Sequence, residues 1–119
     1  MLWLRTVIVG LPVVLASPSW ASGYYSGNQL LNFCAAQDAT FDAVWLAYIV
    51  GATDGLLVMQ DGLKGGGKLC IPAGVKVEQL KDIVVRHLQA HPETRHYAAA
   101  GEVLLSLMES FGCPSNKPR

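Results

Sequence analysis

Three histidines, His87, His91 and His96, are the side chains of this 119-residue chain best suited to bind a metal. His87 and His91 are four residues apart, a spacing that can place two ligands on one face of a helix. His91 precedes Pro92, however, where a helix is expected to break, and no third ligand follows at a defined spacing. We therefore interpret these residues as exposed histidines near a helix end.

The three cysteines, Cys34, Cys70 and Cys113, are the candidate nucleophiles. Cys70 and Cys113 flank two predicted helices that form a hairpin, so we expect them to form a disulfide. Cys34 would then be the free thiol, on the apolar face of another predicted helix, where burial makes a thiol unreactive. A cysteine–histidine pair needs an activated thiol, so we predict a protein that is not an enzyme.

A glycine run followed by lysine, Gly65-Gly66-Gly67-Lys68, is the only candidate for phosphate binding. A phosphate-binding loop needs a lysine followed by Ser or Thr at the start of a helix, whereas Leu69 follows Lys68. We reject a phosphate site and predict an irregular loop over residues 61–74.

Apolar residues recur every three or four positions in four segments, as in amphipathic helices. The predicted helices run from about residue 28, capped by Asn28, to 37, from about 40 to the loop at 61, from 77 to 90, and from 92 to 111. Pro92 suits the first turn of the last helix. No segment has the periodicity of a strand. We predict an all-α fold, a small four- to five-helix bundle held by at least one disulfide.

The second predicted helix carries a ridge of small residues, Ala47, Gly51 and Gly55, spaced by four. Such a ridge lets another backbone approach closely. We favour packing within the molecule, with contact between two copies as the alternative. Asp54 on the same helix lies either on a solvated face or in an ion pair with Arg95.

Residues 1–21 have the features of a signal peptide. Arg5 precedes an apolar run over residues 6–16, which is shorter than the about 20 residues that span a membrane, and Ser19-Trp20-Ala21 suits a signal peptidase. The chain has nine basic and nine acidic residues, so loss of Arg5 leaves a net charge near −1. We expect residues 22–119 to form one domain that binds no nucleic acid and spans no membrane. Export would let its cysteines pair.

Four motifs, in this order, resemble those of the Rap/Tai family, immunity proteins that neutralise peptidoglycan amidases delivered by type VI secretion. The first is Leu-x-x-x-Cys, at Leu30 and Cys34. The second is Cys-x-Gly-Tyr-Ile-x-Gly-x-x-Asp, which the chain matches at Tyr48, Ile49, Gly51 and Asp54. The third is Cys-x-Pro-x-Gly-Val, at Cys70, Pro72, Gly74 and Val75. The last is a His-Pro-Glu segment, at His91, Pro92 and Glu93, whose helix leads to Cys113.

One departure from the family pattern concerns Trp45, which stands where the family has the cysteine expected to pair with Cys34. We expect the Trp45 ring to fill the space beside Cys34 that the missing disulfide would occupy.

The resemblance implies a helical protein of a Gram-negative periplasm that binds a cognate amidase effector and blocks its catalytic cleft, often as a homodimer and with no cofactor. Binding residues concentrate on loops held by a rigid scaffold, so the residues expected to contact the amidase are Asp61, Leu63, Lys64 and Lys68. The alternative is a periplasmic helical chaperone or structural helper protein, which would bind unfolded clients broadly.

Overall fold

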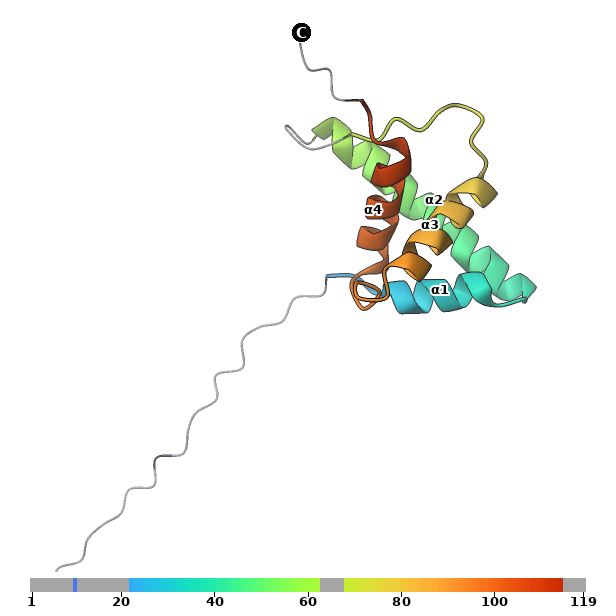
Figure 1. The fold of residues 1–119 in the computed structure, drawn as a ribbon, viewed down its shortest axis with the longest axis vertical. Coiled ribbons are helices and arrows are strands. Elements are labelled where there is room, and N and C mark those ends of the chain that lie inside the picture. Colours follow the sequence, from blue (N-terminus) through green and yellow to red (C-terminus); the bar gives the residue numbers. More distant parts are fainter. Residues whose placement is uncertain (1–9, 11–21, 63–67, 115–119) are drawn as a thin grey trace, which may run out of the picture.

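Four α-helices form the part of the chain that the computed structural model describes, namely residue 10 and residues 22–62 and 68–114. They are α1 (Gly27–Ala35), α2 (Ala39–Gly62), α3 (Val77–Ala90) and α4 (Ala99–Phe111) (Figure 1). Within these ranges the only β-structure is a pair of isolated bridges. The predicted all-α fold is confirmed.

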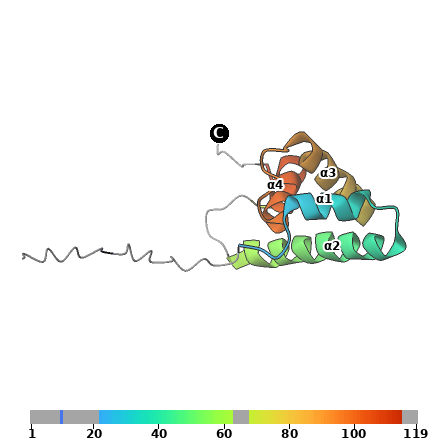
Figure 2. The same ribbon diagram turned by 90° about the horizontal axis from the view of Figure 1, so that it is seen from below.

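The helices pack in two layers around one core. α2 runs along one side of the molecule, and α1, α3 and α4 lie over its inner face (Figure 2). Each helix contacts every other helix. All four helices contribute side chains that lose nearly all solvent exposure: Leu30, Ile49, Val84, Leu88, Val103 and Leu107. Complete burial of such a side chain contributes about 1.5–3 kcal/mol, so this shared core holds the helices together.

The sequence predicted Asn28 as the cap of the first helix. In the structure, Ser26 caps the first turn of α1 instead. Ser26 N–H donates to Gln29 Oε1 at 2.9 Å, and Gln29 N–H donates to Ser26 Oγ at 3.3 Å, which is a capping box. The next position requires glycine, because a Cβ on Gly27 would lie 2.9 Å from Leu88 Cδ2 and 3.0 Å from Arg95 O. α1 therefore packs closely against α3 and the α3–α4 connection.

The α3–α4 connection corrects the predicted start of the last helix. α3 has its predicted bounds, but residues 92–97 form turns and α4 begins at Ala99 instead of Pro92. The carbonyls of Arg95 and Tyr97 accept hydrogen bonds from Asn28 N–H at 2.8 Å and Gly27 N–H at 3.0 Å. The connection is therefore tied to the start of α1 instead of continuing as helix.

The buried face of α4 includes polar side chains. Tyr97, before the helix, and Ala100, in its first turn, are exposed. The buried residues of α4 are Ala99, Glu102, Val103, Ser106 and Leu107. Two of these are polar, and they are tolerated because each makes hydrogen bonds: Ser106 Oγ donates to Val103 O at 2.8 Å, and Glu102 contacts a histidine of α3.

A disulfide between Cys70 and Cys113 joins the segment before α3 to the end of α4. The expectation of at least one disulfide is thus confirmed. Backbone pairing surrounds the bond, since Cys70 N–H donates to Phe111 O at 2.7 Å and Cys113 N–H donates to Lys68 O at 2.8 Å. The two chain segments are held together by covalent and hydrogen bonds at the same place.

Candidate functional site

The two ends of segment 63–67 are held by a set of contacts that we call the loop base, formed by Gln60, Leu69, Cys70, Phe111 and Cys113. Leu69 N–H donates to Gln60 Oε1 at 2.8 Å, and Gln60 Nε2 donates to Leu69 O at 3.3 Å. Leu69 is buried, and the disulfide follows at the next residue. The last turn of α2 is therefore fixed to the strand-like segment beside α4.

Of the four residues predicted to contact a partner, Asp61 and Lys68 lie among the described residues next to this base. Asp61 is exposed in the last turn of α2, so the helix extends into the region that we predicted as loop. Lys68 is exposed just before Leu69. Leu63 and Lys64 lie outside the described residues. Sequence spacing did not identify Gln60, whose role depends on a residue nine positions away.

The outer face of α2 corrects the predicted role of the small-residue ridge. Ala47, Gly51 and Gly55 are exposed, and a Cβ added at either glycine would meet no atom within 4 Å. The ridge is thus not a site of packing within the molecule. Its neighbours include exposed apolar side chains, with Val58 75% and Met59 59% accessible.

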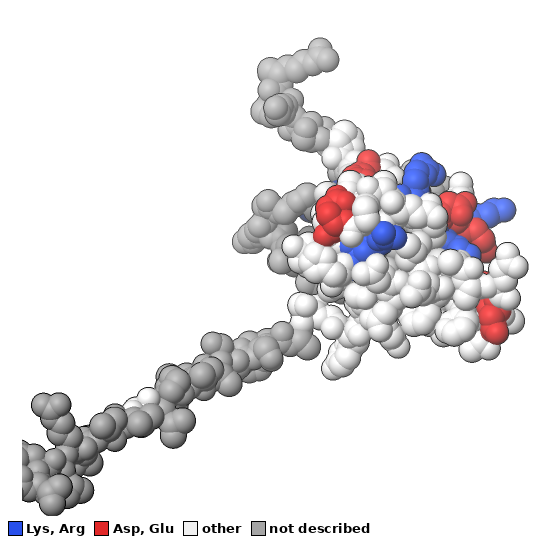
Figure 3. Space-filling view, turned by 60° about the horizontal axis from the view of Figure 1, so that its bottom comes forward, with Lys and Arg blue, Asp and Glu red and all other residues white. Residues whose placement is uncertain are grey.

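Charged side chains are scarce on α1 and α2. α1 contains none, and α2 contains only Asp42, Asp54 and Asp61. In Figure 3 the Lys, Arg, Asp and Glu side chains gather on one part of the visible face and leave a broad area without charge. A surface of this kind loses little hydration energy when another apolar surface covers it.

α2 is also long and apolar enough to cross a membrane, by length and composition, and only 17% of its most apolar window is buried. The sequence had predicted no such segment after residue 21. α2 nevertheless contributes Trp45, Ile49 and Thr53 to the buried interior. Core helices of folded domains and membrane spans share this length and composition.

Asp54 and Arg95 do not form the candidate ion pair. Asp54 is exposed on α2, and the ion pairs among the described residues all involve histidine. Arg95 is partly buried in the α3–α4 connection, where its backbone carbonyl binds the start of α1. Of the two alternatives, the solvated Asp54 agrees with the structure.

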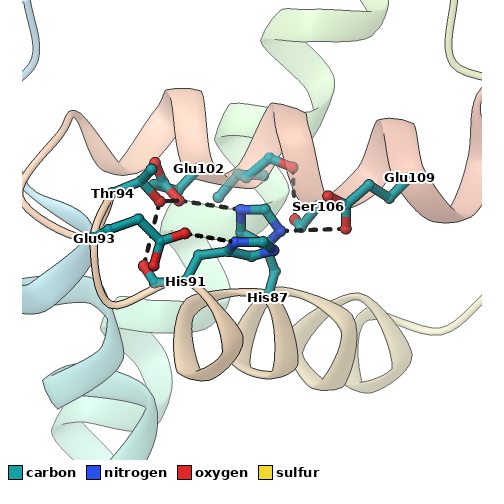
Figure 4. Close-up of polar contacts among 8 residues, drawn as sticks. His87, His91, Glu93, Thr94, Glu102, Ser106 and Glu109 are labelled. Carbon is teal, nitrogen blue, oxygen red and sulfur yellow. Dashed lines mark hydrogen bonds and ion pairs between the residues drawn. The ribbon is translucent and has the colours of Figure 1, made fainter.

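A cluster of histidines and glutamates lies between α3 and α4 (Figure 4). His87 is buried and not exposed, which corrects the prediction for that residue. Its Nε2 lies 3.1 Å from Glu102 Oε2, and its Nδ1 lies 3.3 Å from Glu109 Oε2. Glu102 is 1% accessible and also accepts a hydrogen bond from Thr94 Oγ1 at 3.1 Å.

His91 lies at the end of α3 beside this cluster, with its ring centroid 4.5 Å from that of His87. Its Nδ1 is 3.0 Å from Glu93 Oε1. A backbone hydrogen bond and the bond with His91 lower the pKa of Glu93 from its ordinary value. His96 is exposed and packs against Tyr97. The structure thus brings together His87 and His91, and places two carboxylates of α4 beside them that no sequence motif indicated.

Cys34 is buried in the core together with Trp45. Desolvation by burial raises the pKa of its thiol, and the positive charge of Lys81 opposes this only in part. Trp45 Nε1 donates to Asp42 Oδ1 at 3.0 Å, and Lys81 Nζ lies 4.2 Å from the centre of the Trp45 ring. A thiol in this apolar setting is a weak nucleophile.

Comparison with known protein families gives a match over most of the chain. The family model of the Rap1a immunity proteins matches residues 26–113. The matched span begins at the N-cap of α1 and ends at the second cysteine of the disulfide. No curated protein and no solved structure matches the chain.

Proposed function

Because the chain belongs to the Rap1a family of immunity proteins, which act against type VI effectors, we propose that it binds one cognate peptidoglycan amidase in the periplasm and blocks its catalytic cleft. Inhibition is by occlusion. The protein fills the groove that the peptidoglycan substrate would enter, and it needs neither a cofactor nor a reaction of its own.

The observation that carries this proposal is the loop base. The Gln60–Leu69 pair and the Cys70–Cys113 disulfide fix both ends of the segment between Gly62 and Lys68. Contacts that are fixed before binding lose less entropy when the partner binds, and the described residues on either side of the segment are fixed in this way. We propose Asp61, Leu63, Lys64 and Lys68 as residues that contact the amidase.

The proposed compartment rests on the leader and the disulfide. Residues 1–21 are proposed to be a signal peptide that is cleaved after Ala21. A disulfide is stable in the oxidising periplasm and rare in the reducing cytoplasm, so the bond between Cys70 and Cys113 favours export.

We further propose that the outer face of α2 is covered by the same face of a second copy. Ala47, Gly51 and Gly55 allow two helices to approach closely, and Val58 would pack beside them. The face carries few charges, so two copies do not repel each other. In sedimentation velocity, the wild-type protein should form a dimer that Val58→Glu converts to monomer. Gln89→Glu, at an exposed position of α3, should leave the dimer unchanged.

Binding is tested by titrating the purified protein against the product of the neighbouring gene, which the proposal expects to be the cognate amidase. Lys64→Glu and Lys68→Glu should each weaken binding at least about 10-fold, equal to about 1.4 kcal/mol. The charge-matched control is Lys76→Glu, at the exposed start of α3, which should bind like wild type. Equal affinities for all four proteins would place the contact surface elsewhere.

The alternative function, a periplasmic helical chaperone, is favoured by one observation. The exposed apolar residues of α2 would suit unfolded clients if no second copy covered them. A reduced, unfolded client protein therefore belongs in the same titration. Comparable binding to that client and to the amidase would support the chaperone, whereas the immunity proposal predicts binding to the amidase alone.

A further inference from the structure

Both ring nitrogens of His87 face a carboxylate oxygen. Nε2 lies 3.1 Å from Glu102 Oε2, and Nδ1 lies 3.3 Å from Glu109 Oε2. A neutral imidazole has one N–H, and an ionised carboxylate only accepts hydrogen bonds. One of the two contacts therefore needs an additional cation between nitrogen and oxygen, which is either a proton or a metal ion. Glu102 is the more buried carboxylate, so it is the one that receives the N–H.

His91 directs a second nitrogen to the same place. Its Nδ1 is 3.0 Å from Glu93 Oε1, which leaves Nε2 with a free lone pair. The imidazoles of His87 and His91 lie against each other, and Glu109 approaches them from α4 (Figure 4). One potential ligand atom from each of His87, His91 and Glu109 lies within 4.8 Å of the other two.

We propose that His87 Nδ1, His91 Nε2 and a carboxylate oxygen of Glu109 bind a divalent zinc-class metal ion between α3 and α4. Two imidazoles and one carboxylate are a donor set that suits Zn²⁺, with a water as the fourth ligand. Mg²⁺ prefers oxygen ligands and is a poor match. This site is independent of the proposed inhibition of an amidase.

The surroundings of the three ligands have the form that histidine–metal sites require. A histidine that binds a metal usually donates its other N–H to a carboxylate or carbonyl, which fixes the tautomer and the ring. Glu102 occupies that position for His87, and Glu93 occupies it for His91. Thr94 Oγ1 in turn donates to Glu102 and orients it. Both proposed imidazole ligands thus have a partner already in place.

The local charge also favours a cation. Glu93, Glu102 and Glu109 surround the two histidines, and within the described ranges none of these carboxylates forms an ion pair with Lys or Arg. Arg86 lines the adjacent surface pocket, but it is exposed and its side chain can extend into water. A divalent ion would offset the charge of buried Glu102 and of Glu109 at once.

The geometry needs only a small adjustment to reach bonding distances. Zinc binds imidazole nitrogen at about 2.0–2.1 Å, so the ligand atoms of a tetrahedral site lie about 3.3 Å apart. His87 Nδ1 and Glu109 Oε2 already have this separation, and only wider distances within the cluster must shorten. His87 is fixed in the interior, whereas the Glu109 side chain is 61% accessible and free to adjust. Binding would join the end of α3 to the last turns of α4.

The test measures Zn²⁺ affinity of the untagged, oxidised protein by competition with a chromophoric chelator. We expect one Zn²⁺ per chain and a rise in unfolding temperature with Zn²⁺ but not with Mg²⁺. His91→Ala and Glu109→Gln should each weaken binding at least about 100-fold, the upper end of the loss seen when a supporting residue is removed. Both residues lie at the surface. The unfolding temperatures of the two variants without metal will show that the variants fold.

Two matched controls exclude other donors. His96→Ala removes an exposed histidine outside the cluster, and Cys34→Ala removes the free thiol. Both should bind Zn²⁺ like wild type. Absence of binding in the wild type would mean that a proton occupies the position between His87 and Glu109, and would overturn the proposal. So would wild-type affinity in His91→Ala or Glu109→Gln, or an equal loss in either control.

Discussion

Gln60 and Leu69 are joined by two hydrogen bonds, at 2.8 Å and 3.3 Å, which link the last turn of α2 to the chain that returns toward α3. The amide of one side chain satisfies both backbone groups of a buried residue. These bonds attach the chain that leaves α2 and the chain that returns toward α3 to each other at the helical core.

Replacement of Gln60 by alanine should lower the free energy of unfolding by about 1–3 kcal/mol, because each lost hydrogen bond contributes about 0.5–1.5 kcal/mol. Urea unfolding measures this loss. Gln89→Ala, at an exposed position of α3, is the control and should change stability by less than about 0.5 kcal/mol. Equal stability of the two variants would mean that the Gln60–Leu69 contact does not hold the loop ends.

Loss of the disulfide should lower the free energy of unfolding by more than replacement of Gln60 does. The two cysteines are 43 residues apart, and the entropy of closing a loop of this length corresponds to about 4 kcal/mol. Cys70→Ser/Cys113→Ser should therefore unfold at a markedly lower urea concentration than the oxidised protein. Peptide mapping without reductant should recover the Cys70–Cys113 peptide as the main species, and a main peptide containing Cys34 would contradict the assignment.

Glu102 and Glu109 should differ sharply in their importance for folding, although both contact His87. The side chain of Glu102 is 2% accessible and that of Glu109 is 61% accessible. Glu102→Ala removes the contacts with His87 and Thr94, and each hydrogen bond to a charged group contributes about 1.5–3 kcal/mol, whereas an exposed pair contributes up to about 1 kcal/mol. Thermal or urea unfolding of Glu102→Ala and Glu109→Ala in metal-free buffer tests this order, and equal losses would contradict it.

The sequence was sufficient for the helices whose buried faces are apolar. Val77 to Ala90 was predicted with its observed bounds, because Leu80, Val84 and Leu88 repeat at helical spacing. The sequence was insufficient where contacts between residues far apart in the chain determine where a helix begins. The Arg95 and Tyr97 carbonyls bind the start of α1, so the helix predicted from Pro92 does not form there.

Polar residues in the interior were the other source of error. Glu102 and Ser106 are buried because His87 and a backbone carbonyl satisfy them, and no pattern of apolar residues reveals such partners. The same reason explains why the cluster around His87 was missed. Both of its carboxylates, Glu102 and Glu109, come from α4, whereas His87 lies on α3. Packing of the two helices sets which residues of α4 face His87.

The rate at which the Cys34 thiol is alkylated should be low in the folded protein and should rise with pH. Burial raises the pKa of its thiol above the ordinary value of 9.0, so less thiolate is present at any given pH than in the unfolded chain. Alkylation by iodoacetamide should be slow in the native protein and fast in urea, and the native rate should rise with pH. The raised thiol pKa contributes stability below about pH 9, and that contribution is lost as the pH rises through the folded pKa. Equal rates in native and unfolded protein at pH 8 would contradict this burial.

The central claim is that the protein protects a cell from one type VI amidase, and co-expression tests it most directly. The product of the neighbouring gene, which the proposal expects to be the amidase, is exported to the periplasm with and without the full-length protein, and lysis is recorded. We predict that wild type and Lys76→Glu prevent lysis and that Lys64→Glu/Lys68→Glu does so poorly at the same protein level. Lysis that continues unchanged in the presence of folded, exported wild-type protein would contradict the claim.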